Sequence, residues 1–400
     1  MKLRLLGRLP LTALVVAIVV ALGTAGIFVG RAEALRARAN VETFSPSSLS
    51  FITPDRGWVL GSIPCPSTKG CLGMRSTRDG GQRWSRVTLP LGLDAQVRKG
   101  DGPGAYGDIT DSMEVHFADA RNGWIYNTEL PILWSTHDGG KAWNRISLAH
   151  VGKYGSIFDV ESSGRTVYVI AAVGNGRATL FRSSITNDSW SVVATALNLP
   201  AGGANPGGTI VLKGASGWLV VGNDRGVSAA LTLDARGKWV TWTPPCEEVG
   251  NSYFVPVAIT IRELAVVCTM GGFASPLSKT APPGAKLFSN WLYLSSNAGH
   301  SFHYGPALGH TWDPELLASP SPHVLLLVQF NVDKSNLYRI IRSVDGGWNW
   351  SVVYRGGWAL SVSFPSAERG LVLVQKSAGN DSLLVSDNGG IHWSQVSFSS

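Results

Sequence analysis

Four carboxylates are the residues of this sequence that could do acid–base chemistry on a bound substrate. Asp108 and Asp111 lie close together, and Asp313 and Glu315 form a second pair later in the chain. Glycoside hydrolysis uses two carboxylates, which are about 5 Å apart in retaining enzymes and about 6.5 to 9.5 Å apart in inverting enzymes. The spacing in sequence leaves open whether the fold brings these residues to one channel mouth, so they are candidates for a glycan-active hydrolase.

Other catalytic signatures are missing from the sequence. It contains no Gly-x-Ser-x-Gly, no phosphate-binding loop, no dinucleotide-binding fingerprint and no His-Glu-x-x-His. Its eight His residues form no cluster with ligand spacing. We therefore expect no cofactor and no metal, and a binding protein rather than an enzyme.

An octapeptide that ends in an aromatic residue recurs along the chain and indicates how the fold is organised. Residues 77–84, 136–143 and 343–350 share the frame Ser/Thr-x-Asp-x-Gly-x-x-Trp, and residues 386–393 have Asn at the Asp position. Three further copies are degraded. The copies begin at residues 77, 136, 183, 232, 295, 343 and 386. A period of this length predicts a repeat architecture with seven units.

A second motif precedes several of these copies. Phe51, Phe117 and Phe364 each stand six positions before a Gly that is followed by Trp or Leu, and Gly217-Trp218 is a related copy. Apolar runs between the motifs are typical of strands that are buried on both faces. These runs are residues 167–173, 218–221 and 323–330.

The octapeptide resembles the Asp-box of the BNR-repeat β-propellers, which include sialidases, sortilin-type receptors and photosystem II assembly factors. The resemblance covers residues 48–398 and implies an all-β fold, a seven-bladed β-propeller of four-stranded antiparallel blades. The combination of Phe, Gly-Trp and the box is most similar to the assembly-factor branch, which implies a scaffold-like role. Ring closure stays open: residues 41–44 add a strand to the last blade, or the first and last blades simply pack together.

The box residues are expected to be structural. A short Asp or Asn side chain accepts hydrogen bonds from backbone N–H groups of the turn, and the Gly permits positive φ. In the resembling family this turn joins the third and fourth strands of each blade, so the carboxylates would lie too far apart for catalysis or Ca²⁺ binding. The predicted structural residues are Asp79, Trp84, Asp138, Trp143, Asp234, Trp239, Asn297, Phe302, Asp345, Trp350, Asn388 and Trp393.

The N-terminal segment, residues 1–30, is expected to be a signal anchor or a signal peptide, followed by a linker over residues 31–47. Residues 9–30 carry no charge and are long enough as a helix to span a bilayer. Small-x-small cleavage sites lie only beyond this segment, which favours an uncleaved transmembrane anchor. We expect a single-pass membrane protein with its propeller outside the cytoplasm, and a secreted protein is the alternative.

The four cysteines fall into two sequence-local pairs, Cys65 with Cys71 and Cys246 with Cys268. An even number of paired cysteines is typical of disulfides in an oxidising compartment. Reduced thiols are the alternative, and the spacings match no common zinc finger.

The long connections of the chain are expected on one face of the propeller, opposite the boxes. They are residues 91–112, 200–207, 243–253, 271–286 and 305–313. Loops on a rigid repeat scaffold commonly carry the binding function. The candidate ligand-contacting residues on these loops are Arg98, Lys99, Asp101, Tyr106, Asp108, Glu247, Glu248, Tyr253, His310, Trp312 and Asp313.

The expected function is that of a monomeric, non-enzymatic scaffold with a protein or glycan ligand on the long-loop face. Nucleic acid is disfavoured, because the first 40 residues contribute +5 of the net charge of +7. The alternative is a secreted sialidase-like hydrolase or a glycan-binding ectodomain. Sialidases have an Arg-Ile-Pro motif, which this chain lacks. Convergent Arg residues beside a Tyr–Glu pair would favour the hydrolase.

Overall fold

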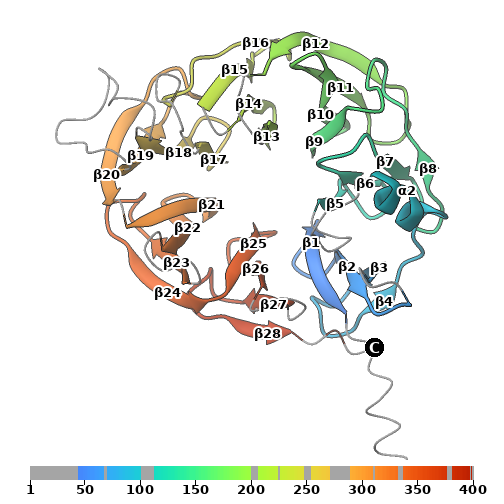
Figure 1. Cartoon of the computed structure of the whole chain (residues 1–400). Coiled ribbons are helices and arrows are strands. Elements are labelled where there is room, and N and C mark those ends of the chain that lie inside the picture. Colours follow the sequence, from blue (N-terminus) through green and yellow to red (C-terminus); the bar gives the residue numbers. More distant parts are fainter. Residues whose placement is uncertain are drawn as a thin grey trace, which may run out of the picture. The chain divides into compact units, whose positions relative to one another are not determined.

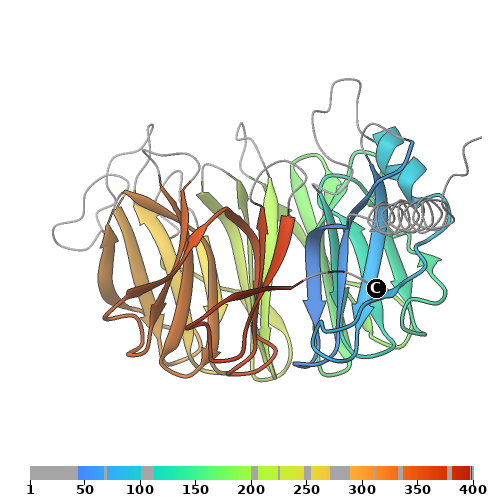
Figure 2. The same cartoon turned by 90° about the horizontal axis from the view of Figure 1, so that it is seen from below.

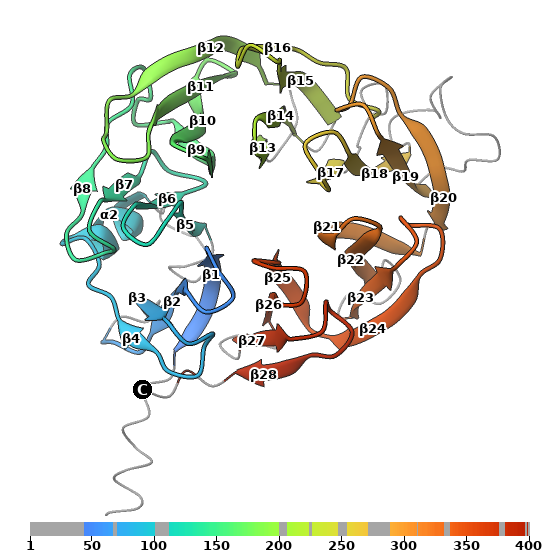
Figure 3. The same cartoon turned by 180° about the vertical axis from the view of Figure 1, so that it is seen from behind.

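Seven four-stranded antiparallel sheets are arranged as blades around a central axis (Figure 1). The first strand of each blade is innermost and the fourth is outermost (Figures 1 and 3). The seven-bladed, all-β prediction is confirmed. The computed structural model describes residues 44–66, 70–100, 112–199, 206–223, 226–246, 254–270, 289–309, 311–331, 337–375, 381–396 and 398.

The strands of the first four blades have the following bounds. Blade 1 has β1 (Ser45–Phe51), β2 (Gly57–Ile63), β3 (Cys71–Thr77) and β4 (Ser85–Arg86). Blade 2 has β5 (Met113–Phe117), β6 (Gly123–Asn127), β7 (Leu133–Thr136) and β8 (Asn144–Arg145). Blade 3 has β9 (Ser156–Ser163), β10 (Thr166–Gly174), β11 (Arg177–Ser184) and β12 (Ser191–Asn198). Blade 4 has β13 (Gly207–Lys213), β14 (Ser216–Asn223), β15 (Gly226–Leu233) and β16 (Trp239–Thr241).

The remaining three blades follow the same order. Blade 5 has β17 (Phe254–Ala258), β18 (Leu264–Met270), β19 (Ser289–Ser295) and β20 (His303–Gly309). Blade 6 has β21 (Trp312–Ser321), β22 (Val324–Asn331), β23 (Tyr338–Ser343) and β24 (Ser351–Gly356). Blade 7 has β25 (Trp358–Ser363), β26 (Gly370–Gln375), β27 (Asp381–Ser386) and β28 (Ser394–Val396).

The predicted membrane-spanning segment lies outside the described residues, as does most of the predicted linker. Within the part of the chain that the structure describes, no helix combines the length and the apolar character needed to cross a bilayer. The first strand begins at Ser45, ahead of the expected propeller start at residue 48.

The core consists of seven hydrophobic clusters, and each cluster lies between two neighbouring blades. The second strand of a blade contributes side chains to the clusters on both of its sides. In β22, Leu325 and Leu327 pack against blade 5, whereas Leu326 and Val328 pack against blade 7. Successive side chains of a strand point to opposite faces, so a strand buried on both faces must be apolar at every position. This explains the uninterrupted apolar runs in the sequence.

The octapeptides form the turns between the third and fourth strands. In the first copy, Asp79 Oδ1 accepts hydrogen bonds from Thr77 Oγ1 and from the Arg83 backbone N–H, both at 2.9 Å. The Gly81 N–H donates to Thr77 Oγ1 at 2.8 Å, and Gly81 has φ +91°. The same pattern recurs in the copies that begin at Thr136, Ser295, Ser343 and Ser386.

Two degraded copies keep only part of this pattern. Asp234 accepts hydrogen bonds from the backbone N–H groups of Arg236 and Lys238, at 2.9 and 2.8 Å. In the copy that begins at Ser183, the Ser183 hydroxyl instead donates to the Asn187 carbonyl at 3.0 Å.

The aromatic residue that ends each octapeptide packs toward the preceding blade. Trp143 of blade 2 contacts the cluster between blades 1 and 2, and Trp350 of blade 6 contacts the cluster between blades 5 and 6. The other copies place their aromatic residues in the same way; these are Trp84, Trp190, Trp239, Phe302 and Trp393. Each octapeptide therefore closes its own turn and also joins two blades.

The Phe–Gly motif is a second packing device. Phe117 pairs directly with Gly123 across β5 and β6, and a Cβ atom on Gly123 would lie 2.5 Å from the Phe117 ring. Gly57 and Gly370 meet Phe51 and Phe364 in the same way. The Gly is required because the ring occupies the space of its missing side chain.

The ring closes by packing and by side-chain hydrogen bonds between blades 7 and 1. Phe398 lies 4.9 Å from the rings of both Phe44 and Trp84. The Arg369 guanidinium donates to the Gly80 carbonyl and to Asp387. In the described residues the sheet of blade 7 contains only β25 to β28, with no strand from the N-terminus.

Two connections differ from the sequence-based expectation. The predicted long connection over residues 305–313 is wrong, because β20 runs to Gly309 and β21 starts at Trp312. Gly and Pro in β20 indicated a loop, but this strand is outermost and an edge strand tolerates Pro. The connection over residues 91–112 begins with a helix, α2 (Leu93–Gly100), which was not predicted.

Candidate functional site

The face that carries α2 is called the α2 face, and the opposite face, with the octapeptide turns, is called the box face (Figure 2). The α2 face holds the starts of the first and third strands of every blade and the ends of the second and fourth. Of the candidate ligand-contacting residues, the structure describes Arg98 and Lys99 in α2, and Trp312 and Asp313 at the start of β21 on this face. Asp101, Tyr106, Asp108, Glu247, Glu248, Tyr253 and His310 lie outside the described residues.

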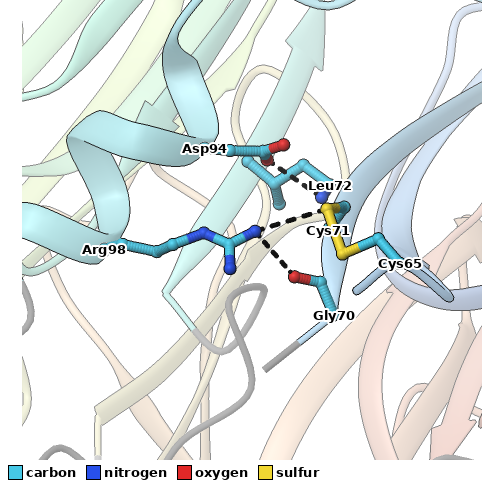
Figure 4. The surroundings of a disulfide bond; sticks show 6 residues. All are labelled: Cys65, Gly70, Cys71, Leu72, Asp94 and Arg98. Atoms are coloured by element: carbon cyan, nitrogen blue, oxygen red, sulfur yellow. Dashed lines mark hydrogen bonds between the residues drawn. A yellow bond between two sulfur atoms is a disulfide. The ribbon is translucent and has the colours of Figure 1, made fainter. Parts of the chain in front are cut away.

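Helix α2 is fixed to the connection that the Cys65–Cys71 disulfide closes (Figure 4). Asp94 Oδ1 accepts a hydrogen bond of 3.0 Å from the Leu72 N–H. One Arg98 nitrogen donates to the Gly70 carbonyl at 2.8 Å and approaches Cys71 Sγ at 3.3 Å. Arg98 therefore serves to hold the helix against blade 1. Lys99 belongs to the same helix.

Apolar side chains complete this docking, and the second disulfide is placed differently. Leu93 and Val97 are buried in the cluster between blades 1 and 2.

The Cys246–Cys268 disulfide joins the end of blade 4 to the second strand of blade 5, inside the cluster between these blades. Both sequence-local pairs are thus bonded, one within a blade and one between blades.

A pocket of about 510 Å³ opens beside α2, over blade 2. Its walls come from α2, from the β6–β7 connection and from the segment between β8 and β9. The lining residues are Gln96, Leu130, Pro131, Ile132, Leu133, Arg145, Ile146, Ser147, Leu148, Val151, Gly152, Lys153 and Ile157. Two of these side chains are cationic and none is acidic. The pocket is therefore an apolar site with a basic rim.

A second group of polar and aromatic residues lies on the α2 face of blade 6, on the side of blade 5. The Arg339 guanidinium lies over the Trp312 ring, 4.0 Å from its centroid, and Arg339 Nε donates to Gln329 Oε1 at 3.0 Å. The Asn290 amide of blade 5 donates to the Trp312 carbonyl at 2.9 Å. These contacts satisfy the polar groups around Trp312 within the protein itself.

Strand β21 of blade 6 also carries two carboxylates: Asp313 accepts a hydrogen bond from Asn290 of blade 5, and Glu315 accepts one from the Trp358 side chain of blade 7. Burial raises the pKa of Glu315 to about 7, and the charge of Asp313 contributes, while a hydrogen bond from the Trp358 side chain acts in the opposite direction. Burial also raises the pKa of Asp313, partly offset by a hydrogen bond from Asn290. Among the described residues, no Lys or Arg forms an ion pair with either carboxylate.

Aromatic residues of neighbouring strands lie beside these carboxylates. The Tyr338 and Trp358 rings are stacked, with centroids 6.1 Å apart and an interplanar angle of 18°. Phe330 lies 6.2 Å from Tyr338. Trp358 is 42% exposed, although it is a large aromatic residue at the start of an innermost strand. The name aromatic–carboxylate ledge is used for the group of five residues Asp313, Glu315, Phe330, Tyr338 and Trp358.

Three further carboxylates lie on the innermost strands of blades 2 and 3. Burial raises the pKa of Glu114 to about 7, and it raises the pKa values of Asp159 and Glu161 as well. Asp159 accepts a hydrogen bond of 2.8 Å from the Ile210 N–H of blade 4. Ser48 of blade 1 donates to Glu114 at 2.5 Å. These contacts join neighbouring blades, so the cluster belongs to the wall of the ring.

Sequence reasoning identified only part of these groups. Trp312, Asp313 and Glu315 were candidates, and the structure brings the last two together. Tyr338 and Trp358 were missed, because they reach the ledge from two other strands and no local motif marks them. Within the described ranges, no three His, Cys, Asp or Glu residues are placed to hold a metal ion.

The arrangement at the ledge differs from the one expected of a sialidase. Tyr338 and Glu315 are neighbours, and the charge of Glu315 helps to raise the pKa of Tyr338. Arg339 and its cross-strand partner Arg355 lie on the opposite face of the sheet, because adjacent residues of a strand point to opposite faces. The described residues therefore bring no Arg cluster to the Tyr–Glu pair.

No family model matches the chain, and no curated protein matches it in sequence. Solved structures with the same fold include YCF48 bound to D1 peptide, with 19% identity, a TM-score of 0.53, and coverage of 87% of this chain and 94% of that chain. YCF48 from Cyanidioschyzon merolae has 13% identity and a TM-score of 0.54, with coverage of 87% and 96%.

Enzymes share the architecture as well. A polysaccharide lyase of family PL25, an ulvan lyase bound to an oligosaccharide, has 11% identity and a TM-score of 0.53, with coverage of 89% of this chain and 96% of that chain. At these identities the likeness concerns the fold, and fold alone does not determine function.

Proposed function

We propose that this protein is an extracytoplasmic, membrane-anchored or secreted propeller of the Asp-box kind that binds a protein segment and performs no catalysis. The observation that carries the proposal is the pocket beside α2. Its apolar walls suit a buried apolar side chain, and Arg145 and Lys153 on its rim suit a neighbouring carboxylate. The expected ligand is a peptide segment in which a large apolar side chain and a carboxylate lie close together.

Three observations support the wider proposal. A YCF48 propeller has been solved with a D1 peptide, so this fold accommodates a peptide ligand in at least one case. The octapeptide turns have the hydrogen bonds expected of Asp-boxes. Disulfides within blade 1 and between blades 4 and 5 favour an oxidising compartment.

Selection from a random dodecapeptide library displayed on phage tests the proposal. We expect enriched peptides to have a large apolar residue next to Asp, Glu or the C-terminal carboxylate. Their affinity should fall at least about tenfold in an Arg145→Glu/Lys153→Glu variant, since two favourable charge interactions become repulsive. Arg182→Glu, a charge reversal at an exposed position of blade 3, is the matched control.

Two outcomes would count against this assignment. Enrichment of peptides without any acidic group would remove the role of the basic rim. Alternatively, the double variant could bind the selected peptides as tightly as the unaltered protein, which would place the ligand elsewhere.

A glycan-active hydrolase is the second candidate, because Asp313 and Glu315 form a carboxylate pair with raised pKa values. Release of methylumbelliferone from a panel of glycosides tests it directly. Activity that is lost in Glu315→Gln and kept in Glu368→Gln, a change at an exposed residue of the box face, would favour the hydrolase over the non-enzymatic scaffold.

A further inference from the structure

We propose that the aromatic–carboxylate ledge between blades 6 and 7 binds an organic cation, an ammonium or guanidinium group, against the exposed side of Trp358. Strands β21 and β25, which carry Glu315 and Trp358, lie across the ring from α2 (Figure 1). None of the ledge residues lines the pocket beside α2, so the proposal is independent of the peptide site.

Among the described residues, no cationic side chain forms an ion pair with the carboxylates of the ledge. Asp313 and Glu315 lie close enough for the charge of one to raise the pKa of the other, and both are partly desolvated. A desolvated carboxylate without a cation nearby costs folding free energy. The titratable groups that interact with Glu315 are Asp313 of the same strand, β21, and Tyr338 of β23, and neither is cationic.

The aromatic rings are a separate observation that points to the same ligand class. The Tyr338 ring stacks on one side of the Trp358 ring, and the Trp358 side chain also donates a hydrogen bond to Glu315. The ring is thus fixed in orientation while 42% of the residue stays exposed. A fixed, electron-rich ring next to carboxylates is a favourable binding site for a cation.

The neighbouring side of blade 6 provides an internal precedent. There the protein places its own guanidinium, that of Arg339, 4.0 Å from the centroid of the Trp312 ring. The two Trp residues stand at the starts of the first strands of adjacent blades, β21 and β25. Among the described residues, Trp312 has a cation over its ring and Trp358 has none.

A neutral sugar is the competing ligand for an exposed Trp beside carboxylates. It would stack on the ring, but it would not neutralise the repulsion between Asp313 and Glu315. A cation does both, so the observations favour the cation.

Titrations followed by NMR of the Trp indole N–H groups test the proposal, with a Trp358→Phe variant to identify the Trp358 signal. The probes are n-butylammonium, n-butylguanidinium, n-butanol and maltohexaose. We expect only the two cations to shift the Trp358 signal. A blocked Gly-Gly-Lys-Gly-Gly peptide distinguishes sources: tighter binding than n-butylammonium indicates a lysine within a chain, and equal or weaker binding indicates a free amine.

Two ledge variants give the expected magnitudes. Glu315→Gln should weaken cation binding about tenfold, since one of two carboxylates loses its charge. Trp358→Ala, followed by calorimetry, should weaken it by about 2- to 30-fold. Glu368→Gln and Trp348→Ala, both at exposed positions of the box face, are matched controls and should bind as the unaltered protein does.

The proposal is overturned if n-butanol or maltohexaose shifts the Trp358 signal as strongly as the cations do, or if Glu315→Gln keeps the full affinity for n-butylammonium. The Arg145→Glu/Lys153→Glu variant separates the two sites. Normal cation binding by this variant supports an independent ledge, and its loss contradicts that independence.

Discussion

Replacing Glu114 by Gln is expected to stabilise the protein at alkaline pH and to change its stability much less at pH 5. Glu114 lies on the innermost strand of blade 2 and accepts a 2.5 Å hydrogen bond from Ser48. Burial raises its pKa from 4.5 to about 7, and the charge of Asp159 contributes. A Gln side chain keeps the size and can accept the same hydrogen bond, but it never becomes charged.

The direction of this pH dependence follows from the number of protons bound in the folded and unfolded states. The unfolded chain ionises Glu114 near pH 4.5, whereas the folded protein holds the proton up to about pH 7. The folded state therefore binds more protons, and its stability decreases as the pH rises through this window. With about 1.4 kcal/mol for each pKa unit, the loss is about 1 kcal/mol at pH 5 and about 3 kcal/mol at pH 8.

A comparison of the two proteins isolates this effect from other titrations. Burial lowers the pKa of His116 to about 4, so neutral His116 gives a stability that rises with pH between about 4 and 6.5 and opposes the trend of Glu114. His116 is present in both proteins, and its contribution cancels in their difference.

Urea unfolding of both proteins at pH 5, 6.5 and 8, followed by Trp fluorescence, measures the difference in free energy of unfolding. We expect it to grow by about 2 kcal/mol in favour of the variant between pH 5 and 8. A constant difference, whatever its size, would refute the reasoning, because burying an amide instead of a carboxyl gives an offset that does not depend on pH. Glu368→Gln should show no such growth.

Three other predictions concern the scaffold. Gly123→Ala should lower the free energy of unfolding by about 1–3 kcal/mol, because the new methyl group meets the Phe117 ring, whereas Gly152→Ala has open space and should cost less than about 1 kcal/mol; urea titration would show equal losses if the Phe–Gly contact were unimportant. Cys65→Ser/Cys71→Ser should cost about 2 kcal/mol and speed amide exchange in α2, since the helix is bonded to this connection; unchanged exchange of α2 would contradict that coupling. Phe398→Ala should cost about 1–3 kcal/mol, less than a fully buried Phe because Phe398 is only partly buried, and should loosen blade 7 against blade 1, as measured by calorimetry and limited proteolysis; an unchanged melting temperature would mean that the ring closes by other contacts.

The architecture was predictable because every blade repeats the same physical solution. An octapeptide turn with its aromatic residue and a Phe–Gly pair each leave a local trace in the sequence, and the traces recur with one period. The second strands were recognisable for the same reason, since burial on both faces removes polar residues from them.

The sequence was less informative where a single blade departs from the repeat. Helix α2 has one short apolar stripe, Leu93 and Val97, inside a connection rich in Gly and charge. Strand β20 contains Gly and Pro, which are tolerated because it lies at the outer edge. The ledge required contacts between blades 6 and 7, which depend on the packing of whole sheets and have no local signal.

The carboxylates of the two faces show opposite pKa shifts, and this contrast bears on where the function lies. On the box face, hydrogen bonds from Arg83 and from Asn349 lower the pKa values of Asp79 and Asp345 to about 2. On the α2 face, burial raises the pKa values of Asp313 and Glu315. A carboxylate whose charge is stabilised by its own turn has little to gain from a ligand. Burial makes the charged form of Asp313 and Glu315 less favourable, so a cation that binds beside them would stabilise that form. Glu315→Gln should therefore stabilise the free protein at pH 8 while it weakens cation binding, and a variant that lost both stability and binding would indicate a purely structural role.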